Sequence, residues 1–224
     1  MKNLSIKLEK IAKEIDKHPY LKLIKFEYNE PLTRDDIRDF VEAEFEIELP
    51  AQFKEIFTQI NGFRLEWEAI ATPDGNYIDS ALEVMGRIDI QDLYTIFEGP
   101  RGNEWKDIIW TDKMPSEEKE EMKGLKPFDF FDPDDGGYIC LALDSTNNLA
   151  NYMVLRSVDY NIRYLNIGIE TYLDLLLHTR GYYRWQFFLN DPISDLYNFQ
   201  VKLKQIKLFL PGYFPDANLA WINT

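Results

Sequence analysis

Aspartates supply the densest group of side chains in this chain that could do chemistry: Asp129, Asp132, Asp134 and Asp135. Carboxylates spaced so closely suggest a metal site. When Asp132 is aligned with position one of a calcium loop, however, position five is a glycine and position twelve is a leucine, where a bidentate glutamate is needed. Because Asp and Gly are also typical turn residues, we interpret the segment as a turn between two strands and predict no metal site.

A second pair of carboxylates, Glu66 and Glu68, stands two residues apart in an alternating segment. Residues two apart on a strand project from the same face. Two carboxylates on one face could act as a glycosidase pair, but a charged sheet face more often meets solvent or a partner. We therefore predict a partner-binding surface made of Glu66, Glu68, Asp132, Asp134 and Asp135.

The remaining candidate nucleophiles and ligands do not form a recognisable constellation. Cys140 lies in the apolar run Tyr138–Leu143, so we expect a buried thiol that packs as a small hydrophobe. Neither His18 nor His178 has a Cys or a second His at zinc-ligand spacing. Residues 99–102, Gly-Pro-Arg-Gly, lack the remainder of a dinucleotide fingerprint and the lysine of a P-loop. We predict no catalytic residue and no cofactor, and hence no enzyme.

Composition narrows the class of partner. The net charge is −14 and the sequence pI is near 4.6. Nucleic-acid binding needs clustered Lys and Arg, so this balance argues against it, whereas an acidic surface steers basic partners. A single cysteine allows no intrachain disulfide, which favours a reducing compartment. The N-terminus does not resemble a signal peptide and no apolar run matches a membrane span, so we expect a cytoplasmic protein.

The stretch Ile47–Phe63 carries the clearest structural pattern. Pro50 suits the first position of a helix. Phe53, Ile56, Phe57 and Ile60 recur at helical spacing and predict one buried face. Gly62 suits the left-handed conformation that ends a helix. Alternation over Arg64–Ile70, with Leu65, Trp67 and Ala69 on one side, then predicts a half-buried strand.

Other patterns predict the elements around this stretch. Helices are expected at Leu4–Ile15, at Glu170–Arg180, and from Asp191–Pro192 to Pro211–Gly212. A further helix is expected to begin at a capping box formed by Thr33 and Asp36. Its buried face should consist of Ile37, Phe40, Val41 and Phe45. Strands are expected at Leu21–Tyr28, within Leu82–Ile90, and at Phe128–Phe131, Gly137–Leu143, Tyr152–Arg156 and Arg163–Ile167. Pro100–Lys126 is aperiodic and is expected to be a long excursion.

Together these elements predict an α+β fold with a mixed, mostly antiparallel sheet packed by helices. Tyr138–Leu143 is apolar on both faces and should be a central strand. We expect a single domain over residues 1–224. It comprises an N-terminal helix at 1–18, a core at about 33–185 and a C-terminal helical extension at 190–224.

The order of motifs resembles the SUKH superfamily, also called the Smi/Knr family. The resemblance rests on Leu49-Pro50, Phe53, Asn61-Gly62 and the following strand with Trp67. The segments KPFDFFDPDDGGYICLAL and IETYLDLLLHTRG resemble the family's central hairpin and late helix, so the likeness covers about residues 33–185. It implies a non-enzymatic fold in which these motif residues are structural. The long excursion and the C-terminal extension depart from the family pattern.

What the resemblance implies about function takes two forms. Bacterial members are similar to immunity proteins that neutralise toxins by direct binding, and fungal members to regulators of cell-wall glucan synthesis. We expect an immunity-type protein that binds a basic toxin, with nucleases as candidates because their surfaces must be positive. The alternatives are an interaction scaffold in wall regulation, or a carbohydrate hydrolase using Glu66, Glu68 or the Asp132–Asp135 loop.

Overall fold

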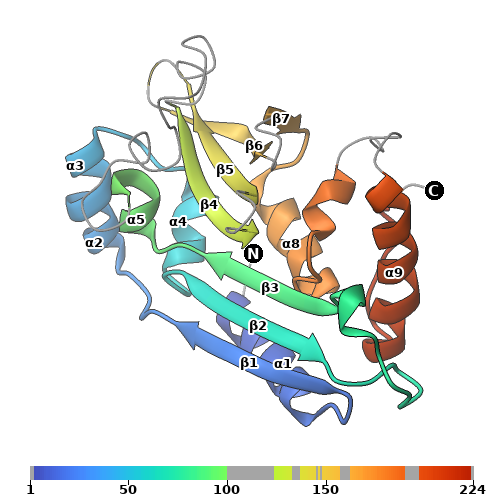
Figure 1. Cartoon of the computed structure of the whole chain (residues 1–224). Helices are drawn as coiled ribbons and strands as arrows, with labels where there is room; N and C mark the ends of the chain where they lie inside the picture. Colours follow the sequence, from blue (N-terminus) through green and yellow to red (C-terminus); the bar gives the residue numbers. More distant parts are fainter. Residues whose placement is uncertain are drawn as a thin grey trace. The chain divides into compact units, whose positions relative to one another are not determined.

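The structure, a computed structural model, describes residues 3–99, 124–132, 137–144, 146, 148–156, 162–189 and 197–222. Its strands form a seven-stranded sheet in which the strand order equals the chain order, β1 to β7 (Figure 1). The strands from β3 to β7 pair antiparallel. This arrangement of helices with a mostly antiparallel sheet confirms the predicted α+β class.

The bounds of the elements agree with most of the sequence predictions. The strands are β1 (Leu21–Tyr28), β2 (Phe63–Ala69), β3 (Met85–Ile90), β4 (Leu125–Asp132), β5 (Gly137–Leu143), β6 (Leu149–Arg156) and β7 (Ile162–Leu165). The α-helices of the described ranges are α1 (Leu4–Lys17), α2 (Arg34–Ile37), α3 (Ala43–Phe45), α4 (Ala51–Phe57), α5 (Leu93–Glu98), α8 (Ile169–Thr179) and α9 (Tyr197–Tyr213). A π-helical turn, η1 (Arg38–Glu42), joins α2 to α3, and 3₁₀ turns form η2 (Ser80–Leu82) and η4 (Trp185–Leu189).

The chain divides into two compact units. Unit 1 comprises Met1–Leu4, Tyr28–Phe63 and Asp89–Glu170, and unit 2 comprises Ser5–Glu27, Arg64–Ile88 and Thr171–Thr224. The expected single domain over residues 1–224, with its core at about 33–185, stays a prediction. Residues 100–123 of the expected excursion and the turn at 133–136 lie outside the described ranges, as does the expected helix start at Asp191–Pro192. The end of the excursion was placed too late, because β4 already begins at Leu125.

In unit 1, α4 follows the predicted pattern closely. Phe53, Ile56, Phe57 and Ile60 are all buried. Pro50 is the N-cap and the helix begins at Ala51, one residue later than predicted, which is the usual uncertainty of a helix end. In the same unit, β5 lies between β4 and β6, and its Cys140 is fully buried, as predicted.

Gly62 has a role other than ending α4, which already stops at Phe57. Its φ of +80° lies in the left-handed region, as predicted. A Cβ at this position would lie 2.7 Å from the backbone nitrogen of Asp92. The glycine is therefore needed because the backbone entering β2 packs directly against the start of α5.

The helix that begins with the capping box corrects one prediction. Thr33 and Asp36 form the box, with the Asp36 amide donating to Thr33 Oγ1 at 3.1 Å and the Thr33 amide donating to Asp36 Oδ2 at 2.9 Å. Ile37 and Val41 are buried, but Phe40 is 63% exposed. The reason is the π-helical turn η1, in which the Ala43 amide donates to the carbonyl of Arg38, five residues back. This wider turn breaks the 3.6-residue period that placed Phe40 inward.

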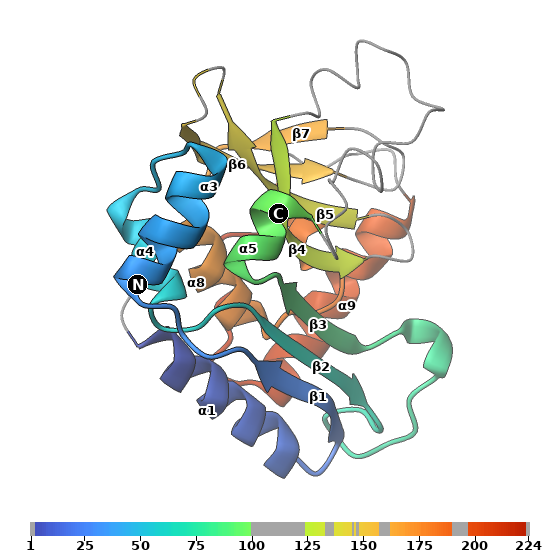
Figure 2. The ribbon, with the colours of Figure 1, turned by 90° about the vertical axis from the view of Figure 1, so that its left-hand side faces the viewer.

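In unit 2, α1 lies alongside β1 (Figure 2) and buries Leu8, Ile11 and Ile15. Trp67 on β2 is also buried, and its Nε1 donates to the carbonyl of Arg180 at 2.8 Å. α8 buries Leu173, Leu176 and Leu177. α9 continues through Pro211 to Tyr213, so the predicted stop at Pro211–Gly212 was slightly early.

Candidate functional site

Glu66 and Glu68 project from one face of β2, as predicted, but both are paired with cations of the same unit. Glu66 lies 3.7 Å from Arg64 and 3.9 Å from Arg87. Glu68 lies 2.9 Å from Lys22 Nζ. Arg64, Arg87 and Lys22 therefore lie within ion-pair distance of these two carboxylates. Partner binding by this face of β2 stays a prediction.

Asp132 differs from the exposed loop residue that the sequence suggested. It is the last residue of β4 and only 2% exposed. A Cβ at Gly137 would lie 2.9 Å from the Asp132 Cβ, which shows how closely the paired β5 covers it. Asp134 and Asp135 lie outside the described residues. Because Asp132 belongs to unit 1 and the β2 glutamates to unit 2, a surface shared by these residues stays a prediction.

The motif residues behind the SUKH resemblance occupy structural positions. Leu49, Phe53 and Trp67 are buried. Asn61 Oδ1 accepts a hydrogen bond from the Leu93 amide at 2.9 Å, at the first residue of α5. The Asn-Gly pair therefore supplies both a side-chain acceptor and a close backbone contact for the start of α5. The sequence alone did not link these two segments.

A different region of unit 1 carries the concentrated negative charge. The acidic segment, residues 34–48, contains seven acidic side chains and two arginines, a formal charge of −5. Arg38 pairs with Asp35 at 2.8 Å and with Asp39 at 2.7 Å. The carboxylates of Glu44, Glu46 and Glu48 are exposed. The sequence signal for this segment is its charge count, which helical and strand periodicity do not show.

One carboxylate of the acidic segment points inward and fixes the segment to α4. Glu42 Oε1 accepts hydrogen bonds from the Leu49 amide at 2.7 Å and from Lys54 Nζ at 2.8 Å. The Lys54–Glu42 pair is largely shielded from water, with side-chain exposures of 28% and 14%. Such a pair holds the segment in one position better than a fully exposed pair would.

Aromatic side chains accompany these carboxylates. α3 and α5 lie side by side (Figure 2), and Phe45 contacts the rings of Tyr94 and Phe97 at centroid distances of 5.7 and 5.8 Å. Tyr94 is 41% exposed, and Phe40 of η1, an element that contacts α5, is 63% exposed. The negative charge of Glu98 is the main reason that the pKa of the Tyr94 phenol is raised, with smaller contributions from desolvation and Glu44. The pKa shift thus indicates a negative field at this surface.

We name this region the acidic aromatic surface and define it by Phe40, Tyr94, Asp39, Glu44 and Glu98. All five residues are at least partly exposed. An exposed phenylalanine among carboxylates has no role in the core of unit 1. Aromatic anchors of this kind are typical of protein interfaces.

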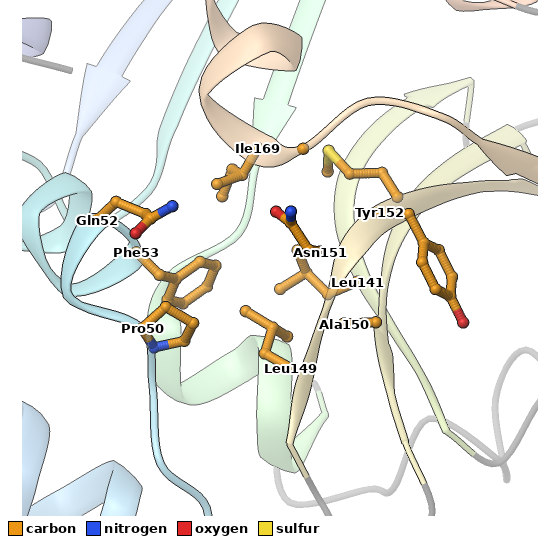
Figure 3. Close-up of a pocket in the computed structure, with 11 residues that line it drawn as sticks. Pro50, Gln52, Phe53, Leu141, Leu149, Ala150, Asn151, Tyr152 and Ile169 are labelled. Atoms are coloured by element: carbon orange, nitrogen blue, oxygen red, sulfur yellow. The ribbon is translucent and has the colours of Figure 1, made fainter.

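Unit 1 also contains a pocket of about 220 Å³. Figure 3 shows Pro50, Gln52 and Phe53 on one side of it, Leu141 and Leu149 opposite, and Ile169 at the start of α8. Local sequence patterns do not predict this pocket, whose lining residues Leu149–Met153 lie at a register shift between β5 and β6.

Within the described ranges, no three His, Cys, Asp or Glu side chains are arranged to hold a metal ion. Among the helices that can be described, none has the length and apolar character needed to cross a bilayer.

No family model matches the chain, and comparison with curated proteins and with solved structures gives no match. The SUKH resemblance therefore stays a prediction that rests on the motif residues themselves.

Proposed function

We propose that this chain is a non-enzymatic protein-binding domain that binds a basic protein partner through the acidic aromatic surface. The observation that carries the proposal is the 63% exposure of Phe40 in a segment with a formal charge of −5. Exposing a large apolar side chain forgoes the roughly 1.5–3 kcal/mol that burial would contribute. Contact with a partner recovers that contribution.

The charge of the surface supports the class of partner. Carboxylates attract a positively charged protein over several ångströms and raise its association rate. Aromatic side chains then supply the apolar contact area that holds the complex together. The combination suits a partner with Lys and Arg around an apolar patch, whereas a nucleic-acid backbone would be repelled.

A toxin is the partner that we favour. A nuclease toxin must carry positive charge to hold phosphates, and an inhibitor can use the same field to block it. The SUKH resemblance implies the same role, that of an immunity protein acting in the cytoplasm by direct binding.

Co-expression with the product of the neighbouring gene tests this proposal. If that product arrests growth, the wild-type chain should relieve the arrest and co-purify with it. The variant Asp39→Lys, Glu44→Lys, Glu98→Lys should fail to do so. The control variant Asp16→Lys, Glu27→Lys, Asp74→Lys has the same net charge, with its changes at exposed residues of unit 2, and should still protect. Growth arrest that the wild type does not relieve, with no complex formed, rejects the immunity role.

A further inference from the structure

The pocket of unit 1 is formed by an irregularity of the sheet. Leu141 pairs with Met153 and Leu143 pairs with Leu149, so four residue steps of β6 face two steps of β5. Such bulges bend a strand, disrupt the ladder locally and are common beside functional sites. Here the bulged residues Leu149–Tyr152 form one wall of the pocket, and the start of α4 forms the other.

The floor and the rim of the pocket differ in chemistry. Phe53, Leu141 and Met153 line the floor, and each is at most 2% exposed. Gln52 and Asn151 are exposed at the rim (Figure 3). Each side-chain amide offers donors and an acceptor. The floor thus suits an apolar group, and the rim suits a neutral polar group such as a peptide bond.

Size decides between a free ligand and a single side chain. The volume of about 220 Å³ is below the roughly 300–1,000 Å³ typical of small-molecule sites. It exceeds the roughly 150 Å³ of a cavity that holds benzene. One leucine or phenylalanine side chain from a partner therefore fits, whereas a cofactor does not.

The charges beside the pocket indicate what should flank that side chain. Glu48 lies two residues before Pro50, and Glu170 follows Ile169; both are exposed. The nearest base along α4 is Lys54, whose ammonium is already paired with Glu42. Flanking Lys or Arg residues are therefore favoured over acidic ones.

We propose that this pocket is an anchor site that takes one apolar side chain of an extended peptide segment flanked by basic residues. The protein that supplies this segment is the basic partner, and this part of the proposal rests on the proposed function. Pro50 and Phe53, which the sequence marked as structural motif residues, then also line a binding site.

Capped tripeptides test the anchor site without the partner. In NMR titrations, N-acetyl-Lys-Leu-Lys amide should give saturable shifts confined to Leu141, Leu149, Met153 and Ile169. N-acetyl-Lys-Ser-Lys amide should bind roughly tenfold more weakly or not at all, because it lacks the buried leucine side chain. N-acetyl-Glu-Leu-Glu amide should bind at least about threefold more weakly at low salt.

Two variants locate the binding. Leu149→Trp fills the pocket and should abolish the shifts, while Tyr164→Trp, which places the same side chain on β7 outside the pocket lining, should leave them unchanged. Equal binding of the leucine and serine peptides, or binding that survives Leu149→Trp, overturns the anchor site. Absence of saturable shifts at tens of millimolar peptide also overturns it. None of these three results bears on the acidic aromatic surface, because its co-expression test uses other residues.

Discussion

The helix α4 and the acidic segment, both in unit 1, have similar apolar spacing but differ in the burial of their apolar side chains. In α4 the Lys54 amide donates to the Pro50 carbonyl, four residues back, and every apolar residue of its stripe is buried. In the acidic segment the Ala43 and Ile47 amides donate to carbonyls five residues back, those of Arg38 and Glu42. The wider turns rotate the side chains, and Phe40 points to solvent.

The difference shows where helical spacing fails to predict which side chains are buried. α4 is regular and its side chains serve the core. The acidic segment contains a π-helical turn, a feature frequent at functional sites, and it exposes an aromatic ring among carboxylates. A place where local preference and structure disagree is often one that function has shaped. This agrees with the proposed partner-binding role.

The largest expected effect on stability comes from a substitution in α4. Phe53→Ala removes a fully buried ring and should lower the free energy of unfolding by roughly 3–5 kcal/mol. Urea denaturation monitored by tryptophan fluorescence measures the change. A loss below about 1 kcal/mol would show that α4 does not hold the core.

The next effect concerns the contact between Gly62 and the start of α5. Gly62→Ala should cost roughly 1–3 kcal/mol, because an L residue is strained at φ +80° and its Cβ would lie 2.7 Å from the Asp92 nitrogen. Gly75→Ala is the matched control. It has a similar φ of +78°, but its Cβ meets only the end of the Tyr20 side chain. An equal loss in both variants would mean that the backbone contact contributes nothing.

A pH effect distinguishes the acidic segment from α4, whose N-cap has no side-chain hydrogen bond. Hydrogen bonds from the hydroxyl and amide of Thr33 lower the pKa of Asp36 in the folded state. A lowered carboxyl pKa stabilises the fold above the unfolded value of about 3.9, and this contribution is lost as the pH falls through the folded value. Asp36→Asn should therefore be more destabilising at pH 6 than at pH 3, as measured by urea midpoints. A pH-independent difference would contradict the capping box.

The smallest effect on stability is expected at the residue that departs from the helical pattern. Phe40→Ala should change the free energy of unfolding by no more than about 0.5 kcal/mol, because the ring is 63% exposed. The same urea experiment compares it directly with Phe53→Ala. A loss as large as that of Phe53→Ala would place Phe40 in the core and remove the basis of the proposed surface.

Particular residues show which features of the fold and of the site could be predicted from the sequence. The α4 stripe, the alternation around Trp67, the central strand at Tyr138–Leu143 and the capping box at Thr33 were predictable because local periodicity and capping determine them. The exposure of Phe40 was not, since a π-helical turn has no clear sequence signal. The cations that pair with Glu66 and Glu68 were also hidden, because Lys22 and Arg87 lie on other strands. The pocket depends on strand register, which local patterns do not fix.

The most direct measurement of the central claim is the association kinetics of the purified chain with the product of its neighbouring gene. Phe40→Ala should raise the dissociation rate by roughly tenfold, because an aromatic anchor is lost. The variant Asp39→Lys, Glu44→Lys, Glu98→Lys should lower the association rate by at least about tenfold at low salt, an effect that weakens as salt is added. The charge-matched control, Asp16→Lys, Glu27→Lys, Asp74→Lys, should change that rate by less than about threefold. Equal losses in both triple variants, with no effect of Phe40→Ala, would contradict binding through the acidic aromatic surface.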